Sequence, residues 1–575
     1  MLFRSHQLGD RLDEGNILNN IGVVYQSLRK YSEATDYHQQ ALKVARQLGD
    51  RLDEGKTLGN LGTVYYKLHQ LPIAINYLQQ ATNIHDSLRT NLKDQDKVSI
   101  FQNQIKSYKL LAAASWLNQD LPGSLIATER GRARAFSDLL SQRLEANPAI
   151  VKPNTLDFAQ IQTQARSRQA TIVSYSILPD FDHHSPKPHK LLIHVISPTG
   201  KLSVRESLLP KNIQLAQLVD NNRTQLIGSR SQRRFTIDQL KPGMLVRIEG
   251  DSESETKRRI LAINAQKQTV VLQGIGQDPN ETEERAFSEI TGLALSTEHP
   301  KLRQLHQILI EPIVDLLLTN PLTPVIFIPD GELYEVPFAA LENAQHQYLI
   351  DLHPISVAPS ISILAQTARL KQRNIPTSTP SLVIGNPDFS QHQGSYQQLR
   401  FSDDEAREVA RLFPSQLLLG NAATESAVKR WLPSARIAHF ATHGFRDSDN
   451  ALNSGIVLTP SGADSGILTA EKVLNLNLHA DLVVLSACNT GRGKITGDGV
   501  IGLSRSFITA GAASTIVSLW SIDDRATSVL MSEFYRQWRG GKSKTQALRD
   551  AMLKTKAQYP DPYFWSSMSL YGEID

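Results

Sequence analysis

Cysteine is almost missing from this chain, because Cys488 is the only one among 575 residues. A lone cysteine excludes an intramolecular disulfide and any zinc site built on several thiolates, and it is typical of a reducing compartment. The 16 histidines are scattered and form no ligand pattern, so we expect neither a metal site nor a cofactor. What chemistry the lone thiol performs is therefore the first question.

Long apolar runs and a strong charge imbalance are absent as well. No stretch approaches the ~18 apolar residues that a membrane-spanning helix needs, and the first residues lack the apolar core of a signal peptide. The formal net charge is only +4, which gives no support for a nucleic-acid partner. We expect a cytoplasmic protein of several globular domains that binds no membrane and does not bind nucleic acid directly.

An internal repeat occupies the amino-terminal part. Leu8–Gly15 recurs as Leu48–Gly55, a period of 40 residues, and Asn20–Tyr25 has its counterpart in Asn60–Tyr65. Small and aromatic residues at matched positions predict two antiparallel helices per unit, which must stack on neighbours to bury their apolar faces. The pattern resembles the tetratricopeptide repeat over residues 1–90, an all-α solenoid, with a helical extension or cap over 91–147. Such a solenoid implies a protein partner or activator, with pure scaffolding as the alternative.

The middle of the chain changes character after Pro148 and Pro153, which mark a domain boundary. Apolar runs predict strands at 171–178 and 190–197, the second followed by a hairpin. Short strand patterns with polar turns predict a small all-β insertion over residues 228–284. Apolar spacing then predicts helices over 286–293 and 302–317.

Strand and helix signals alternate from residue 325 to the end, which predicts a mostly parallel sheet covered by helices. One buried strand, Leu482–Ala487, leads into Cys488, and another, Ile437–Thr442, leads into His443. A thiolate and an imidazole at neighbouring carboxyl ends of a parallel sheet would form a cysteine–histidine dyad.

Several ordered motifs in this part resemble the CHAT domain, a caspase-like peptidase domain that is often fused to tetratricopeptide repeats. The motifs are Val325–Leu341, Ala441–Gly444, Ser486–Gly491, Gly497–Leu503 and Ser518–Asp524. The resemblance covers residues 155–575 apart from the insertion, and it implies a pseudo-caspase-like first half, 155–320, and a catalytic half, 321–575. The whole chain is thus expected to be multidomain, a solenoid followed by an α/β caspase-like domain with an all-β insertion.

The same resemblance assigns roles to individual residues. Cys488 would be the nucleophile and His443 the base, and the N–H groups of Gly444 and Cys488 would form the oxyanion hole. Several relatives cut after Arg or Lys, so Asp498 is a candidate wall of an acidic S1 pocket. Weaker candidates for that pocket are Asp447, Asp523 and Asp524, each of which reads equally well as a loop charge or a helix cap.

Two functions from different classes follow. The first is a regulated endopeptidase that cleaves protein substrates, with the repeats holding a partner or activator. The second is a non-catalytic scaffold that binds peptides or partner proteins without cleaving them. The sequence leaves the physiological substrate, the activator and the oligomeric state open.

Overall fold

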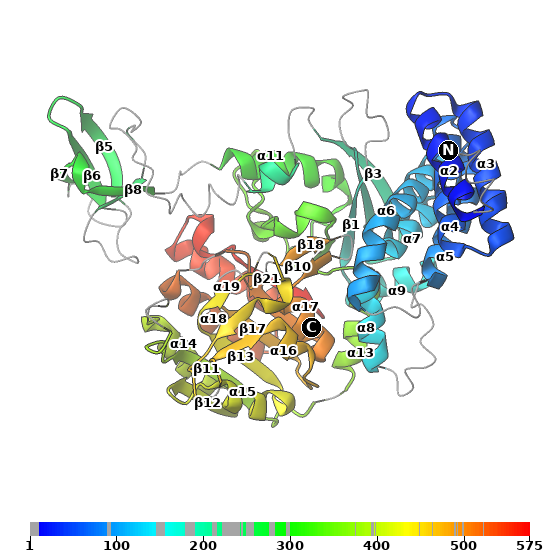
Figure 1. Ribbon diagram of the computed structural model, residues 1–575. Coiled ribbons are helices and arrows are strands. Elements are labelled where there is room, and N and C mark those ends of the chain that lie inside the picture. The colour runs from blue at the N-terminus through cyan, green and yellow to red at the C-terminus, as the bar shows by residue number, and fades with distance from the viewer. Residues whose placement is uncertain are drawn as a thin grey trace.

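The computed structural model in Figure 1 describes most of the chain. The described residues are 11–88, 94–144, 156–178, 190–209, 215–220, 242, 245–248, 258–274, 282–294, 299–373, 375–392, 396, 398–447, 449–462, 464–487, 490–491, 493–496, 499–520 and 523–575. Helices come first, then one large sheet with helices on its faces, which confirms the predicted fold class.

Four antiparallel helices form the two repeats: α2 (Arg11–Ser27), α3 (Tyr31–Leu48), α4 (Arg51–Lys67) and α5 (Leu71–Leu88). Glycine allows the two helices of each unit to approach closely, because a Cβ at Gly62 would lie 2.5 Å from the Leu78 side chain. The same position in the first repeat pairs Gly22 with the ring of His38, 2.6 Å from where a Cβ would be. The period read from the sequence is therefore a period of helix packing.

The helical extension contacts both the repeats and the sheet domain. It consists of α6 (Asp94–Leu117), α7 (Leu121–Arg130) and α8 (Arg134–Leu144). Lys109 Nζ lies 2.6 Å from Asp330 Oδ2, just beyond strand β9 (Val325–Ile328). Arg143 donates to the carbonyl of Leu476 at 2.6 Å and also to that of Leu474, at the end of α16 (Ala470–Leu474). The helices are thus bound to the domain that carries the candidate site.

A single sheet of 11 strands runs through the rest of the chain. Its order is β12 (Ser415–Gly420), β11 (Ser381–Pro387), β13 (Ile437–Ala441), β17 (Leu482–Ser486), β20 (Ser514–Ser518), β21 (Met568–Gly572), β10 (Ile355–Val357), β9 (Val325–Ile328), β1 (Thr171–Ile177), β2 (Lys190–Ile196) and β3 (Leu202–Leu208). Neighbours are parallel except at the β20–β21, β1–β2 and β2–β3 pairs. The central strands are wholly buried, which explains their unbroken apolar runs.

Helices cover the sheet on both sides, as alternating strands and helices require. They include α9 (Phe158–Arg168), α11 (Pro300–Leu309), α13 (Ile361–Lys371), α14 (Arg400–Leu412), α15 (Glu425–Trp431), α17 (Leu503–Ala510), α18 (Asp524–Arg539) and α19 (Lys544–Gln558). Thr424 caps α15, since its Oγ1 accepts from Ala427 N at 3.2 Å. The predicted helix over 302–317 is broken: α11 ends at Leu309, and a 3-10 turn over Glu311–Leu316 contains Pro312.

The insertion is a small antiparallel sheet that projects from the domain on the side away from the repeats (Figure 1). Its strand order is β7 (Thr282–Ala286), β6 (Thr269–Gly274), β5 (Arg258–Asn264), β4 (Leu245–Ile248) and β8 (Ile290–Ala294). Much of the predicted span before residue 258 lies outside the described residues. The predicted helix over 286–293 is wrong, because β7 ends there and β8 begins, paired with β4.

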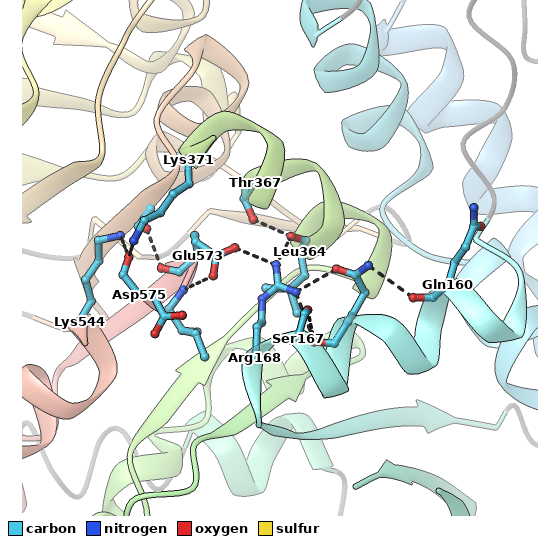
Figure 2. A network of polar contacts seen from close by, with 12 residues as sticks. Gln160, Ser167, Arg168, Leu364, Thr367, Lys371, Lys544, Glu573 and Asp575 are labelled. Carbon is cyan, nitrogen blue, oxygen red and sulfur yellow. Dashed lines mark hydrogen bonds and ion pairs between the residues drawn. The ribbon is translucent and has the colours of Figure 1, made fainter. Parts of the chain in front are cut away.

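A polar network joins residues 573–575 to helices from early and late parts of the sheet domain (Figure 2). Arg168 Nη2 donates to Glu573 Oε2 at 2.7 Å and to the carbonyl of Leu364 at 2.8 Å. Lys544 Nζ donates to the Asp575 O atom at 2.5 Å. Burial, with Lys371 close by, lowers the pKa of Lys544 to about 7. The network joins α9, α13 and α19 to the residues that directly follow β21.

Candidate functional site

The candidate site lies where β13 and β17 end. These strands are parallel neighbours, and Ala441 pairs in register with Ser486. Beyond this pair Thr442 N still donates to Ser486 O at 3.3 Å. His443 follows Ala441 by two positions and Cys488 follows Ser486 by the same offset. The predicted adjacency of the two strands is confirmed, whereas Cys488 itself lies outside the described residues, so the dyad stays a prediction.

The backbone of His443 is held by β15 (Gly455–Val457), because Val457 N donates to His443 O at 2.9 Å. Thr442 Oγ1 donates to Val457 O at 2.6 Å, which fixes the preceding residue to the same strand. The side chain is half-buried. His443 therefore leaves the sheet edge on a backbone that is anchored on both sides.

Two aromatic rings contact the His443 imidazole, and both come from the segment after β11. The Phe389 ring lies 4.9 Å away, centroid to centroid, at an interplanar angle of 62°. The Tyr396 ring lies 5.2 Å away at 36°. The sequence analysis did not identify these residues. They do follow a buried parallel strand, so the rule that drew attention to His443 and Cys488 applies to them too.

Gly444 begins the short strand β14 (Gly444–Phe445), which pairs antiparallel with β15, Gly444 opposite Ile456. The bond from Val457 N to His443 O makes the next pair, Gly444 with Ile456, one that exchanges no hydrogen bonds. The Gly444 N–H therefore points away from β15. This direction is compatible with the predicted oxyanion role of Gly444.

The loop after β17 is tied to the end of β20 on both sides of Cys488. The carbonyl of Ala487 accepts from Ser518 Oγ at 2.5 Å and from Thr490 Oγ1 at 3.2 Å. Thr490 Oγ1 in turn accepts from Ser518 N at 3.0 Å. Gly491 N donates to Ser518 O at 2.8 Å. Two hydroxyls and one backbone segment thus fix the residues that flank the candidate nucleophile.

Of the aspartates predicted for an acidic S1 pocket, Asp447 shapes its own loop. Its Oδ1 accepts from the backbone N–H groups of Asn450 and Asp449, each at 2.9 Å. Its Oδ2 accepts from Asn453 Nδ2 at 3.2 Å. Hydrogen bonds from Asn450, then Asn453 and Asp449, lower the pKa of Asp447. This carboxylate is therefore occupied in holding a turn.

Asp523 and Asp524 both act at helix starts. Asp523 caps α18, since its Oδ1 accepts from Ala526 N at 2.9 Å. Asp524 reaches the first turn of α14, where it accepts from Phe401 N at 2.7 Å and Ser402 Oγ at 3.1 Å. Burial raises the pKa of Asp524 to about 6, with the negative charge of Glu405 adding to the effect. These contacts favour the capping interpretation for both residues.

Asp498 lies outside the described residues; in the sequence it falls between β18 (Lys494–Thr496) and β19 (Gly499–Ile501), which pair antiparallel. The two strands of this hairpin contact the 3-10 turn Gly331–Glu335. That turn begins directly after Asp330, the partner of Lys109 on α6. The predicted S1 role of Asp498 stays a prediction.

Neither a metal-binding cluster nor a membrane-crossing helix occurs among the described residues. Within them, no group of three or more His, Cys, Asp or Glu is placed to hold a metal ion. Nor does any helix in that part of the chain have the length and apolar character needed to cross a membrane.

The fold and these residues match two family models. Residues 299–573 match the CHAT domain, and residues 13–87 match a tetratricopeptide repeat model. The chain is therefore a tetratricopeptide-repeat protein with a carboxy-terminal CHAT domain, as the motifs predicted.

Two relatives, one from mouse and one from human, share one name. Tetratricopeptide repeat protein 28 of Mus musculus is 25% identical over 83% of this chain. The Homo sapiens protein of that name is 26% identical over 83% of this chain. The chain spans only 22% of the length of either relative.

Solved structures give weaker likenesses. The Saccharomyces cerevisiae separase–securin complex aligns at 11% identity with a TM-score of 0.44, over 98% of this chain and 47% of that one. The Arg-specific cysteine proteinase gingipain R aligns at 10% identity with a TM-score of 0.32, over 48% of this chain and 66% of that one. Superpositions at these scores carry no functional argument.

Proposed function

We propose that this chain is a regulated cysteine endopeptidase in which Cys488 is the nucleophile and His443 the general base. The register of Ala441 with Ser486 is the observation that carries the proposal. It brings the two segments out at the same edge of a parallel sheet, where active sites of such sheets form. The two residues stand at the same offset beyond their paired strand ends.

The chemistry is acyl transfer in two steps. The Cys488 thiolate attacks the peptide carbonyl carbon, and the C–N bond breaks as His443 gives its proton to the leaving amine. Water, deprotonated by His443, then attacks the thioester and releases the acid and the free thiol. A thiol has a usual pKa near ~8.5, so an adjacent imidazolium would favour the thiolate at neutral pH.

Charge that develops on the carbonyl oxygen needs donors fixed in advance. We assign this role to the N–H groups of Gly444 and Cys488. Support for Gly444 comes from its place in a pair that exchanges no hydrogen bonds, which directs its N–H away from β15.

The repeats are proposed to hold a protein partner or activator. An open hollow of about 420 Å³ lies against α3 and α5, and it is lined by Gln39, Leu42, Lys43, Arg46, Gln47 and Tyr77. Helix α8 connects the repeats to the candidate site, because Arg134 Nη2 at its start lies 3.5 Å from Asp86 Oδ1 of α5. The helix also contacts α17, which follows the β18–β19 hairpin. Movement of the helical array would therefore reach the segment between Cys488 and α17.

The alternative is a non-catalytic scaffold that binds peptides or proteins at the same edge. The repeats alone are compatible with it, since solenoids serve as binding surfaces without catalysis. The two functions differ in whether the thiol is activated.

The deciding experiment is cleavage of a positional peptide library by the full chain, with Cys488→Ala and His443→Ala beside it. The endopeptidase is supported when the wild-type chain cleaves and both variants are silent. Cleavage that persists in Cys488→Ala would assign the activity to a contaminant or another group. If the wild-type chain is silent and its thiol alkylates no faster than a free cysteine, the scaffold is favoured.

The S1 prediction is tested on the same library. Asp498→Asn should remove a preference for Arg or Lys at the cleaved bond, because the pocket loses its negative charge. Asp447→Asn is the matched control, since its carboxylate is already occupied by Asn450 and Asn453. If the preference follows Asp447 instead, the assignment of the pocket to the β18–β19 turn is wrong.

A further inference from the structure

The His443 imidazole sits in a corner formed by two other rings. Phe389 and Tyr396 lie 4.9 and 5.2 Å from it, and their own centroids are 6.2 Å apart at an angle of 48°. Phe389 is fully buried, whereas Tyr396 is half-buried. A histidine side chain has a broad, roughly two-fold preference about its Cβ–Cγ bond, so its own covalent geometry does not select one ring orientation. Rings packed against it at two different angles do.

The segment that carries the two aromatic residues is fixed to the body of the domain. Asp388 N donates to Thr459 Oγ1 at 2.9 Å, and Thr459 Oγ1 donates onward to Gly420 O at 2.8 Å. His392 Nε2 lies 2.9 Å from the carbonyl of Leu458. A carbonyl only accepts, so the hydrogen is on Nε2 of His392.

His392 also supports Tyr396 directly. Its ring lies 5.6 Å from the Tyr396 ring at 89°, an edge-to-face contact. Since His392 N donates to Phe389 O at 3.0 Å, the segment closes on itself as a turn. Tyr396 therefore packs against both His392 and Phe389.

One short stretch, residues 457–459, anchors both the backbone of His443 and the segment that carries the aromatic rings. Val457 fixes the His443 backbone, while Leu458 and Thr459 receive the anchors of the aromatic segment. The geometry between His443 and its aromatic neighbours is therefore set by a single frame. A preorganised site needs supporting residues that hold its reacting groups in fixed positions, and residues 457–459 fit that need.

We propose that Tyr396, supported by Phe389 and His392, is a positioning residue that holds the His443 imidazole in its productive orientation. The inference rests on the proposed function, because an orientation matters only if His443 exchanges a proton with Cys488. Tyr396 acts through its ring face and not through its hydroxyl.

The test uses the single thiol of the chain as its own reporter. Iodoacetamide alkylates Cys488, the only cysteine, and the rate at about neutral pH reports the thiolate that His443 generates. The variants are Tyr396→Leu, which removes the ring, and Tyr396→Phe, which keeps it. His443→Ala gives the rate without a base. Tyr559→Leu is the control, a half-exposed ring that packs on Phe564 at 5.3 Å.

We expect Tyr396→Leu to lower the rate by about 10- to 100-fold, toward that of His443→Ala, as misplacement of a reacting group does. Tyr396→Phe and Tyr559→Leu should stay within about twofold of wild type, since both keep the packing of His443. With a peptide substrate, Tyr396→Leu should lower kcat and leave KM unchanged. Recovery by phenylalanine separates positioning from general damage to the fold, and Tyr396→Met replaces leucine if that variant unfolds.

The outcomes distinguish the positioning role of Tyr396 from the proposed dyad of Cys488 and His443. If Tyr396→Leu and Tyr396→Met react like wild type while His443→Ala is slow, the positioning role is overturned and the dyad stands. If Tyr396→Phe is as slow as Tyr396→Leu, the hydroxyl acts and the ring-packing account is wrong. If His443→Ala reacts as fast as wild type, the proposed function fails and this inference with it.

Discussion

The hydroxyl of Ser518 donates to the carbonyl of Ala487 at 2.5 Å, one residue before Cys488. Ser518 ends β20, the strand next to β17 on the side away from His443. The strand that leads to the candidate nucleophile, β17, therefore lies between β13, which leads to His443, and β20, which ends at Ser518. Each neighbour fixes a different part of the same edge.

Ser518→Ala should loosen this loop at small cost to the fold. Ala487 O keeps its bond from Thr490 Oγ1, so the loss of stability should be about 1 kcal/mol. Cleavage and Cys488 alkylation should fall by about 10-fold or more, because the Ala487 carbonyl, one residue before Cys488, loses its bond from Ser518. The rates are measured by single-turnover kinetics with stability from urea unfolding.

The control for Ser518 is on the same strand. The buried hydroxyl of Thr515 has no hydrogen-bond partner among the described residues. Thr515→Val should therefore leave both rates unchanged and be neutral or stabilising, since it removes an unsatisfied polar group. Equal loss of activity in both variants would show that any change in β20 disturbs the site, and would refute a specific role for Ser518.

The first repeat should weaken in acid because of His38. Burial lowers the pKa of His38 to about 4, below its unfolded value of ~6.5. The unfolded chain then binds the proton more readily, so stability is complete above pH ~6.5 and falls as the pH drops toward ~4. The expected slope is about 1.4 kcal/mol per pH unit.

His38→Leu should flatten this dependence, since Leu78 fills the matched position of the second repeat and is fully buried there. Hydrogen exchange of α2 and α3 measures the local stability between about pH 7 and 5. His69 lies outside the helices, and His69→Leu serves as the control that should keep the wild-type slope. A slope that survives in His38→Leu would contradict the assignment.

The sequence predicted the residues at the strand ends of the site, but not the side chains that pack around His443. Apolar runs placed His443 and Cys488 at strand ends, because a strand buried on both faces shows itself as an unbroken apolar stretch. The same rule points to the segment after β11, but it does not show that Phe389 and Tyr396 contact His443. Phe389 touches His443 only because β11 lies beside β13, and strand order in a parallel sheet is set by long-range packing that one sequence does not display.

The failure over 286–293 has a similar cause. Phe287, Ile290 and Leu293 recur at three-residue intervals, which is the spacing of a helix face. In the structure Ile290 pairs with Ile248 and Leu293 with Val246, so pairing with β4 overrides the local pattern. Thr490 and Ser518, 28 positions apart, likewise meet only through the β17–β20 pair.

Asp524 should produce the opposite pH dependence to His38. Its pKa is raised to about 6 in the folded chain, above the unfolded value of ~3.9. Its contribution to stability is therefore complete below pH ~3.9 and is lost as the pH rises through about 6. Asp524→Asn should abolish this fall while its amide oxygen still accepts from Phe401 N.

Urea unfolding of Asp524→Asn and wild type at about pH 4 and pH 7 gives the difference. Asp523→Asn is the control, because it keeps a cap for α18 and lacks the contact with α14. If wild type and Asp524→Asn lose stability equally between the two pH values, Asp524 does not carry the raised pKa. A changed cleavage preference in Asp524→Asn would instead favour its S1 role.

The buried pair of Arg168 and Glu573 should be costly to disrupt. Both side chains are almost fully buried, at 4% and 7% exposed, and the atoms lie 2.7 Å apart. Removing one partner leaves the other charge buried without its counter-charge, so Glu573→Ala should cost about 3–5 kcal/mol. Glu573→Gln should cost less, because its amide oxygen still accepts from Arg168.

The matched control is the exposed pair of Arg205 and Asp315, which lie 3.0 Å apart at 41% and 62% exposure. Asp315→Ala should change stability by about 0–1 kcal/mol, because water screens that pair. Replacing both Arg168 and Glu573 by leucine should recover part of the loss, since no uncompensated charge remains. If the double variant is as unstable as Glu573→Ala, an uncompensated buried charge is not the cause of the loss.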